Sequence, residues 1–199
     1  MATHALAPIP TLPCWQLIPD GPTIQGTDPT GTVRFATQDF GTVLQTLGDA
    51  TPDTERVAVC AAAWLGIRPE TVPVSRRLWA YVCSPFAAPT AAQQQQHRTW
   101  AQQLARLAWS HGFWPIVPHL YAPQFLDDTN PAERTLGLAW GLQQLTQCSV
   151  VYVLAVPPSP GMQAELAALT PDHVLCHVPL DALPPLPTSC AQHSTSPDM

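Results

Sequence analysis

A short segment in the second half of the chain combines a hydroxyl, a glycine and a carboxylate at spacings that suit chemistry on an anionic ligand. Ser159 and Gly161 form a turn after an apolar run, and Glu165 follows one turn inside a predicted helix. The N-terminus of such a helix directs its amides, together with the Ser159 hydroxyl, at an anion. A carboxylate beside this turn can attack or stabilise the anomeric carbon of a ribose. The alternative is a solvated glutamate that complements the helix dipole.

Other polar residues near predicted strand ends are candidates for the same site. Between Leu78 and Val178 the only carboxylates are Asp127, Asp128, Glu133, Glu165 and Asp172. His119 follows a predicted strand and can hydrogen-bond a base or a phosphate, although a histidine after Pro118 also serves as a structural anchor of a loop. Tyr81 can lie near a bound sugar or belong to the core of its strand.

Four compact apolar runs predict the strands that must position these residues. They cover residues 78–83, 113–117, 150–155 and 173–178, and such runs are typical of buried parallel strands. Helical spacing of apolar residues predicts helices over 91–111, 130–148 and 162–169. This alternation predicts a Rossmann-like (flavodoxin-like) α/β domain over residues 78–179, with a parallel sheet and helices on both faces.

The candidate residues should meet at one edge of this sheet. Ligands of open parallel sheets bind beyond the carboxyl ends of the strands. Three segments reach that edge, namely 84–86, 118–128 and 159–165. We therefore expect Ser84, His119 and Glu165 to share one cleft.

The rest of the chain divides into an N-terminal extension and two tails. Residues 1–13 are rich in proline and residues 180–199 in proline and serine, so both are predicted to be disordered. In residues 14–75, strands are predicted at 14–18 and 32–36 and helices at 39–48 and 53–65. This region forms either a small α+β appendage or extra layers on the main domain, and no motif in it indicates a role.

Composition excludes several classes of protein. The chain has no lysine and a net charge of −6 at pH 7, which excludes Schiff-base and P-loop lysine chemistry and argues against a nucleic acid polymer as partner. No apolar run approaches the roughly 20 residues of a membrane span. No signal peptide is evident, so we expect a soluble cytoplasmic protein with reduced cysteines. His173, Cys176 and His177 straddle a strand that points neighbours to opposite faces, so we predict no metal site.

Four ordered blocks of sequence carry a resemblance to a known superfamily. The blocks are 81–86 (YVCSPF), 115–119 (PIVPH), 124–134 (QFLDDTNPAER) and 159–165 (SPGMQAE). Together they resemble an uncharacterised bacterial and phage family of the nucleoside 2-deoxyribosyltransferase-like superfamily. The likeness covers about residues 78–169, and the ordered set is more specific than its last block alone.

This resemblance implies roles for several residues. The glutamate of the last block is the nucleophile in characterised relatives, which implies that role for Glu165. Relatives with serine at the position of Ser159 are similar to nucleoside 5′-monophosphate N-glycosidases, in which it contacts the phosphate. Relatives also use a second carboxylate upstream, for which Asp128 or Glu133 could serve.

One departure from the family lies in the loop after the first strand. Relatives carry glycines or an arginine there, whereas residues 86–89 of this chain read Phe-Ala-Ala-Pro. A phosphate site would then rely on Ser159, helix amides and Arg98 or Arg134.

We therefore expect an N-glycosidase that acts on a nucleoside 5′-monophosphate or a nucleoside and needs no cofactor. The expected catalytic residues are Glu165 and Asp128, and the expected substrate contacts are Ser84, Phe86, His119, Ser159, Gly161 and Met162. Two alternatives stay open: a nucleotide-binding or sensing module without turnover, and a scaffold in which residues 14–75 bind a protein partner. Relatives often build their sites at a dimer interface, so a homodimer is also an open expectation.

Overall fold

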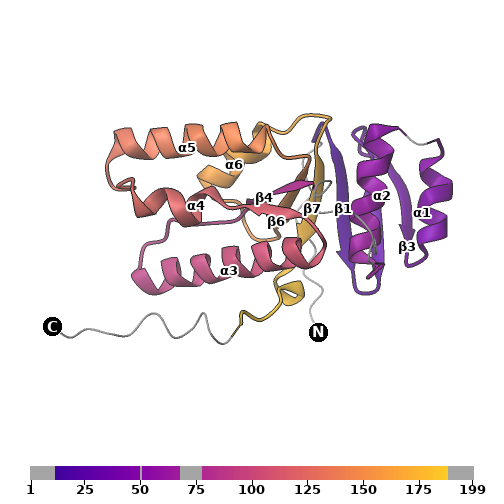
Figure 1. Ribbon diagram of the computed structural model, residues 1–199, viewed down its shortest axis with the longest axis horizontal. Helices are drawn as coiled ribbons and strands as arrows, with labels where there is room; N and C mark the ends of the chain where they lie inside the picture. The colour runs from indigo at the N-terminus through magenta and orange to yellow at the C-terminus, as the bar shows by residue number, and fades with distance from the viewer. Residues whose placement is uncertain (1–11, 50, 68–77, 188–199) are drawn as a thin grey trace.

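The fold is built on one sheet of seven strands. A computed structural model describes residues 12–49, 51–67 and 78–187. The strand order is β3-β2-β1-β7-β6-β4-β5 (Figure 1). The strands are β1 (Trp15–Asp20), β2 (Thr23–Thr27), β3 (Val33–Thr37), β4 (Trp79–Cys83), β5 (Trp114–Ile116), β6 (Val150–Leu154) and β7 (Val174–Val178).

The sheet as a whole is mixed, although the four strands predicted within residues 78–179 pair in parallel. The pairs β4–β5, β4–β6, β6–β7 and β1–β7 are parallel, whereas β2 runs antiparallel to β1 and β3. β1 aligns Trp15 with Val174 and Leu17 with Cys176, so the strands of the N-terminal region continue the sheet of residues 78–179. An antiparallel hairpin is possible here because a tight turn at Gly21, with φ of 56°, connects β1 directly to β2.

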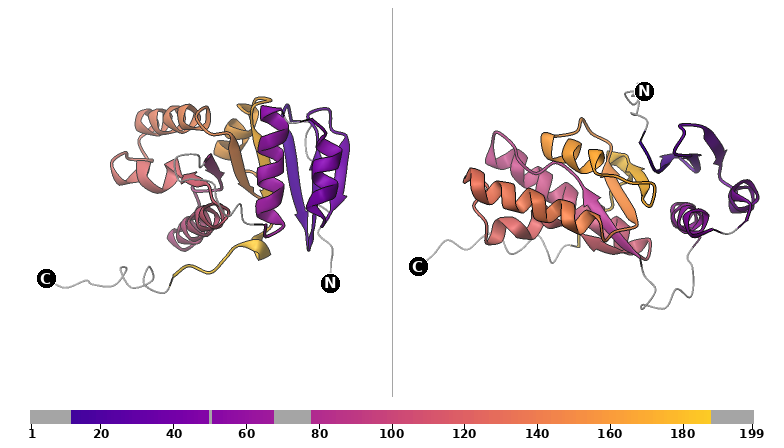
Figure 2. Two further views of the ribbon diagram at one scale, coloured as in Figure 1. Left: turned by 45° about the vertical axis from the view of Figure 1, so that its right-hand side comes forward. Right: turned by 90° about the horizontal axis from the view of Figure 1, so that it is seen from above.

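Helices cover both faces of the sheet, as predicted. They are α1 (Phe40–Leu47), α2 (Pro52–Trp64), α3 (Ala91–Ser110), α4 (Pro118–Tyr121), α5 (Pro131–Leu145) and α6 (Pro160–Ala167), with the 3-10 helices η2 (Ala122–Gln124) and η3 (Leu180–Ala182). Alternate residues of β4 divide between two cores: Ala80 and Val82 pack with residues of α1, α2 and α3, whereas Tyr81 and Cys83 pack with residues of α5 and α6. Figure 2 shows α1 and α2 on the same side of β1, β2 and β3.

Several helix ends follow from capping residues that are evident in the sequence. Asp39 caps α1 by accepting hydrogen bonds from the amides of Gly41 and Thr42. Asn130 caps α5 in the same way. α3 stops at Gly112, whose φ of 88° is accessible to glycine at little cost.

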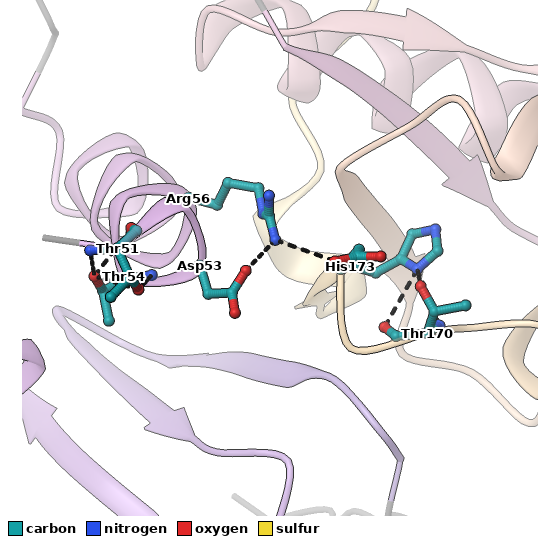
Figure 3. Close-up of polar contacts among 7 residues, drawn as sticks. Thr51, Asp53, Thr54, Arg56, Thr170 and His173 are labelled. Atoms are coloured by element: carbon teal, nitrogen blue, oxygen red, sulfur yellow. Dashed lines mark hydrogen bonds and ion pairs between the residues drawn. The ribbon is translucent and has the colours of Figure 1, made fainter.

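An arginine of α2 ties the N-terminal region to the turn before β7. Arg56 pairs with Asp53 on its own helix and lies 3.9 Å from the Asp172 carboxylate (Figure 3). Beside it, the His173 side chain accepts a hydrogen bond from the Thr170 amide at 3.0 Å and so shapes the same turn. α2 also packs against β1 and β7, so the N-terminal helices and the main sheet share one core.

Three segments differ from the sequence expectation. β2 was not predicted, because its only large apolar residue is Ile24 and because Gly26, against which the Phe35 ring packs, resembles a turn residue. The short helices α4 and η2 occupy residues expected to be a loop. Residues 180–187, which we assigned to a tail, carry η3, and the Pro184 carbonyl accepts a hydrogen bond from Gln103. Residues 1–11 and 188–199 of the two predicted tails lie outside the described residues.

Candidate functional site

A pocket opens beyond the carboxyl ends of β4, β5 and β6. It encloses about 170 Å³. The chain leaves β4 for β5 on one side and returns to β6 on the other, and such a reversal of strand order is where open α/β sheets bind ligands. All eight predicted site residues line this pocket: Ser84, Phe86, His119, Asp128, Ser159, Gly161, Met162 and Glu165.

Glu165 projects from α6 and is held by a tyrosine of β4. The Tyr81 hydroxyl donates a 2.8 Å hydrogen bond to Glu165 Oε1. No donor among the described residues reaches the buried Oε2 with hydrogen-bond geometry. Burial raises the pKa of Glu165, while the Cys83 thiol and the Tyr81 hydroxyl lower it by less. One carboxylate oxygen is thus oriented by Tyr81, and the buried Oε2 has no hydrogen bond of standard geometry from any described residue, although the Cys83 thiol also interacts with the carboxylate.

Tyr81 is both a core residue and a site residue. It is fully buried, and its hydroxyl lies against Gly141 of α5. Burial and the neighbouring Glu165 raise the pKa of Tyr81, so the phenol stays protonated and acts as a donor. The sequence left these two readings open, and the structure combines them.

The next polar group of the pocket is a serine–histidine pair. Ser84 Oγ, directly after β4, lies 3.0 Å from His119 Nε2 at the start of α4. Burial lowers the pKa of His119 to about 4, so the imidazole is neutral at pH 7. The Phe86 ring lies 5.9 Å from the His119 ring, and the Arg98 guanidinium lies over Phe86 at 5.3 Å from its centroid. The pocket lining at this end is aromatic, and the positive charge of Arg98 lies beside it on Phe86, outside the lining.

The two candidates for a second carboxylate differ in their partners. Asp128 forms a 2.7 Å ion pair with Arg134. Both side chains are more than a third exposed, Asp128 at 34% and Arg134 at 40%. Glu133 accepts hydrogen bonds from the Asp127 amide at 2.7 Å and from the Asn130 side chain at 3.1 Å. Glu133 therefore holds the start of α5, and Asp128 is the carboxylate whose partner is another side chain of the pocket.

The N-terminus of α6 offers one amide to a ligand. Ser159 caps the helix by accepting a 3.3 Å hydrogen bond from the Met162 amide. Pro160 has no amide hydrogen, so Gly161 contributes the amide that remains for a ligand. Arg134, the cation that lines the same pocket, is paired with Asp128.

The sequence did not predict that the middle of α5 lines one side of the pocket. Gly137, Leu138, Gly141 and Leu142 line the pocket, whereas the sequence analysis considered only Glu133 and Arg134 at the start of the same helix. The two glycines are four residues apart and therefore lie on one helix face. That spacing was the available signal.

Neither a metal-binding cluster nor a membrane-spanning helix is present among residues 12–49, 51–67 and 78–187. Within these residues, no three His, Cys, Asp or Glu side chains are placed to hold a metal ion. His173 uses both ring nitrogens, one toward Thr170 and one toward the Leu145 carbonyl. In the same part of the chain no helix is long and apolar enough to cross a membrane.

Comparison with known proteins places the matched region on the strands that build the pocket. A family model described as a domain of unknown function (DUF7768) matches residues 79–175, which run from the start of β4 into β7. Comparison with curated proteins gave no match, and comparison with solved structures gave none either. The matched region includes all eight candidate site residues, whereas β1, β2, β3, α1 and α2 lie outside it.

Proposed function

We propose that this protein cleaves the N-glycosidic bond of a nucleoside 5′-monophosphate or a nucleoside, with the Glu165 carboxylate as nucleophile. The observation that carries the proposal is the state of Glu165, a residue that lines the pocket: its carboxylate has a raised pKa, is fixed through Oε1 by Tyr81 and has no hydrogen bond from any described residue at the buried Oε2. Perturbed carboxylates in clefts are common at catalytic centres, although structural networks also produce them.

The chemistry needs only groups that line the pocket, the substrate and water. The Glu165 carboxylate attacks C1′ as the bond from C1′ to the base nitrogen breaks, and the base leaves with the bonding electrons and takes up a proton from water. Tyr81 keeps Oε1 oriented, which reduces the cost of reaching the attack geometry. Water then attacks C1′ of the glycosyl ester and releases the sugar and the carboxylate.

The arrangement of strands supports the same proposal. The four parallel strands of residues 78–179 lie in the order β5-β4-β6-β7, which corresponds to the first four positions of the flavodoxin-like order 2-1-3-4-5. The next position is taken by β1, which comes from the N-terminal region of the chain. We propose that residues 78–179 form a Rossmann-like domain of the nucleoside 2-deoxyribosyltransferase-like superfamily. The pocket lies where ligands of such domains bind. Fold by itself does not establish activity.

A second candidate is a nucleotide-binding or sensing module that has lost turnover. It is favoured by the loop after β4, which has neither glycine nor charge at residues 86–89. The ion pair of Arg134 with Asp128 also favours a module without turnover, because it reduces the positive charge available to a phosphate.

The test is base release by purified protein. Wild type and Glu165→Gln would each be incubated with a panel of ribo- and deoxyribonucleosides and their 5′-monophosphates, and free base would be measured by chromatography. Glu55→Gln is the matched control, because Glu55 is exposed on α2 and lies outside the pocket. We expect wild type and Glu55→Gln to release base and Glu165→Gln to lose activity by at least about a hundredfold.

The other outcomes are also informative. Binding of a panel member without base release would favour the sensing module. Equal release by wild type and Glu165→Gln would remove Glu165 from the mechanism.

A further inference from the structure

The hydrogen bond between Ser84 and His119 can be assigned a direction. Ser84 is only 5% exposed, and a buried hydroxyl needs an acceptor for its hydrogen. His119 Nε2, at 3.0 Å, is the only partner of the Ser84 hydroxyl among the described residues. Ser84 is therefore the donor and Nε2 the acceptor, which leaves Nε2 without a proton. A neutral imidazole carries one proton, and it must then reside on Nδ1.

The surroundings of His119 allow this arrangement. The His119 side chain is only partly buried, so an Nδ1–H group can find an acceptor in solvent or on a ligand. Ser84, which is only 5% exposed, has much less access to solvent. The reverse arrangement, with Nε2–H donating to Ser84, would leave the buried Ser84 hydrogen without an acceptor, which is unfavourable.

We infer that Ser84 is a positioning residue that holds His119 in the tautomer with its proton on Nδ1, so that His119 offers one uncharged donor to an acceptor atom of the ligand. This inference rests on the proposed function for the identity of the ligand. The acceptor it assigns is a carbonyl oxygen or ring nitrogen of the base.

The chemistry of this end of the pocket supports an uncharged acceptor. Burial keeps His119 neutral, since it lowers the pKa to about 4, and a neutral imidazole adds no charge attraction for a phosphate. The Phe86 ring, 5.9 Å from the His119 ring, supplies an apolar planar surface suited to a base. The Gly161 amide and Ser159, where an anion could bind, belong to a different element, α6.

The tautomer can be measured directly and without a substrate. Long-range ¹H–¹⁵N correlation spectra of the ¹⁵N-labelled protein distinguish protonated from unprotonated ring nitrogens, and a His119→Gln sample assigns the signals. We expect Nδ1 of His119 to be protonated and Nε2 unprotonated at pH 7. In Ser84→Ala we expect the proton to move at least partly to Nε2, and in Ser84→Thr, which keeps the hydroxyl, to stay on Nδ1. Ser110→Ala, on the far end of α3, is the control and should leave the spectrum of His119 unchanged.

A kinetic experiment tests the role toward the ligand. In Ser84→Ala we expect KM to rise roughly five- to tenfold with little change in kcat, because one hydrogen bond to the base is weakened. The amide of asparagine places a donor near the position of Nδ1 and that of glutamine near Nε2. His119→Asn should therefore raise KM less than His119→Gln does.

The outcomes separate this inference from the proposed function. Protonation of Nε2 in wild type, or an unchanged tautomer in Ser84→Ala, would overturn the positioning role. If wild type releases no base, titration with thymidine or 2′-deoxyadenosine still decides the binding role. A shift of the His119 Nδ1–H signal supports it, and no shift with either nucleoside contradicts it.

Discussion

Replacing Glu165 with glutamine should make the protein more stable at neutral pH while it removes the proposed activity. Burial raises the pKa of Glu165 above its ordinary value of 4.5. The folded protein therefore binds this proton more tightly than the unfolded chain does. The unfolding free energy must then fall as pH rises from about 4.5 through the raised pKa, and it remains lower at all higher pH. Glutamine carries no charge and avoids this loss.

The size of the gain follows from the unpartnered oxygen. Leaving a buried polar atom without a hydrogen bond costs about 1–3 kcal/mol, and more for a charged group. Glutamine can still accept the hydrogen bond of Tyr81, but its amide nitrogen takes the place of the buried Oε2. Part of the cost therefore remains, and we expect a net gain of about 1 kcal/mol. For a chain of this size the melting temperature should rise by about 2–4 °C.

Thermal unfolding followed by circular dichroism at pH 7.5 and pH 4 measures this gain. Wild type, Glu165→Gln and the exposed control Glu55→Gln would be compared at both values. At pH 4 wild-type Glu165 is mostly protonated in both states, so most of the gain should disappear. The partly buried histidines His111, His119 and His177, with pKa lowered to about 4, lower stability at acid pH equally in all three proteins. An equal or lower melting temperature of Glu165→Gln at pH 7.5, or a gain that persists undiminished at pH 4, would refute the reasoning.

Two further predictions concern glycines. Gly137→Ala and Gly141→Ala both gain about 1 kcal/mol of helix propensity in α5. The added Cβ at Gly137 makes an ordinary contact at 3.5 Å, but at Gly141 it lies 3.2 Å from the Tyr81 hydroxyl. Gly137→Ala should therefore melt about 2–4 °C higher than wild type. Gly141→Ala should gain less in melting temperature and release base more slowly. Identical behaviour of the two variants in thermal unfolding and in base release would argue against Tyr81 as the support of Glu165. Gly26→Ala should lose about 1–3 kcal/mol in urea unfolding, because its Cβ would overlap the Phe35 ring at 2.2 Å, and an unchanged midpoint would mean that the ring moves aside freely.

Local signals in the sequence were sufficient for much of the fold. β4, β6 and β7 were predicted because strands buried on both faces need continuous apolar runs, and 150–154 is buried throughout. The starts of α1 and α5 were predicted because Asp39 and Asn130 satisfy amides of the helix they precede. These causes act within a few residues, so they can be read from the chain itself.

The hairpin of β1 and β2 and its pairing with β7 had no such local signal. β2 has few apolar residues, and the partner of β1 lies about 160 residues away in the chain. The pairing depends on which strand leaves an open edge after the other strands have assembled. Sequence therefore left the N-terminal region as either an appendage or extra layers, and the sheet order decided it.

The same distinction, between local signals in the sequence and contacts between distant residues, applies to the candidate site. The sequence alone determined which side chains could do chemistry and that these side chains follow predicted strands. Because parallel strands bring their carboxyl ends to one edge of the sheet, the sequence also predicted that the side chains would lie at that edge. Only the tertiary structure decided which of them touch. Tyr81 donates to Glu165 across 84 positions of sequence and Ser84 bonds His119 across 35. Burial, which sets the pKa of Glu165 and of His119, comes from helices packed over the pocket rather than from the neighbours of either residue in the chain.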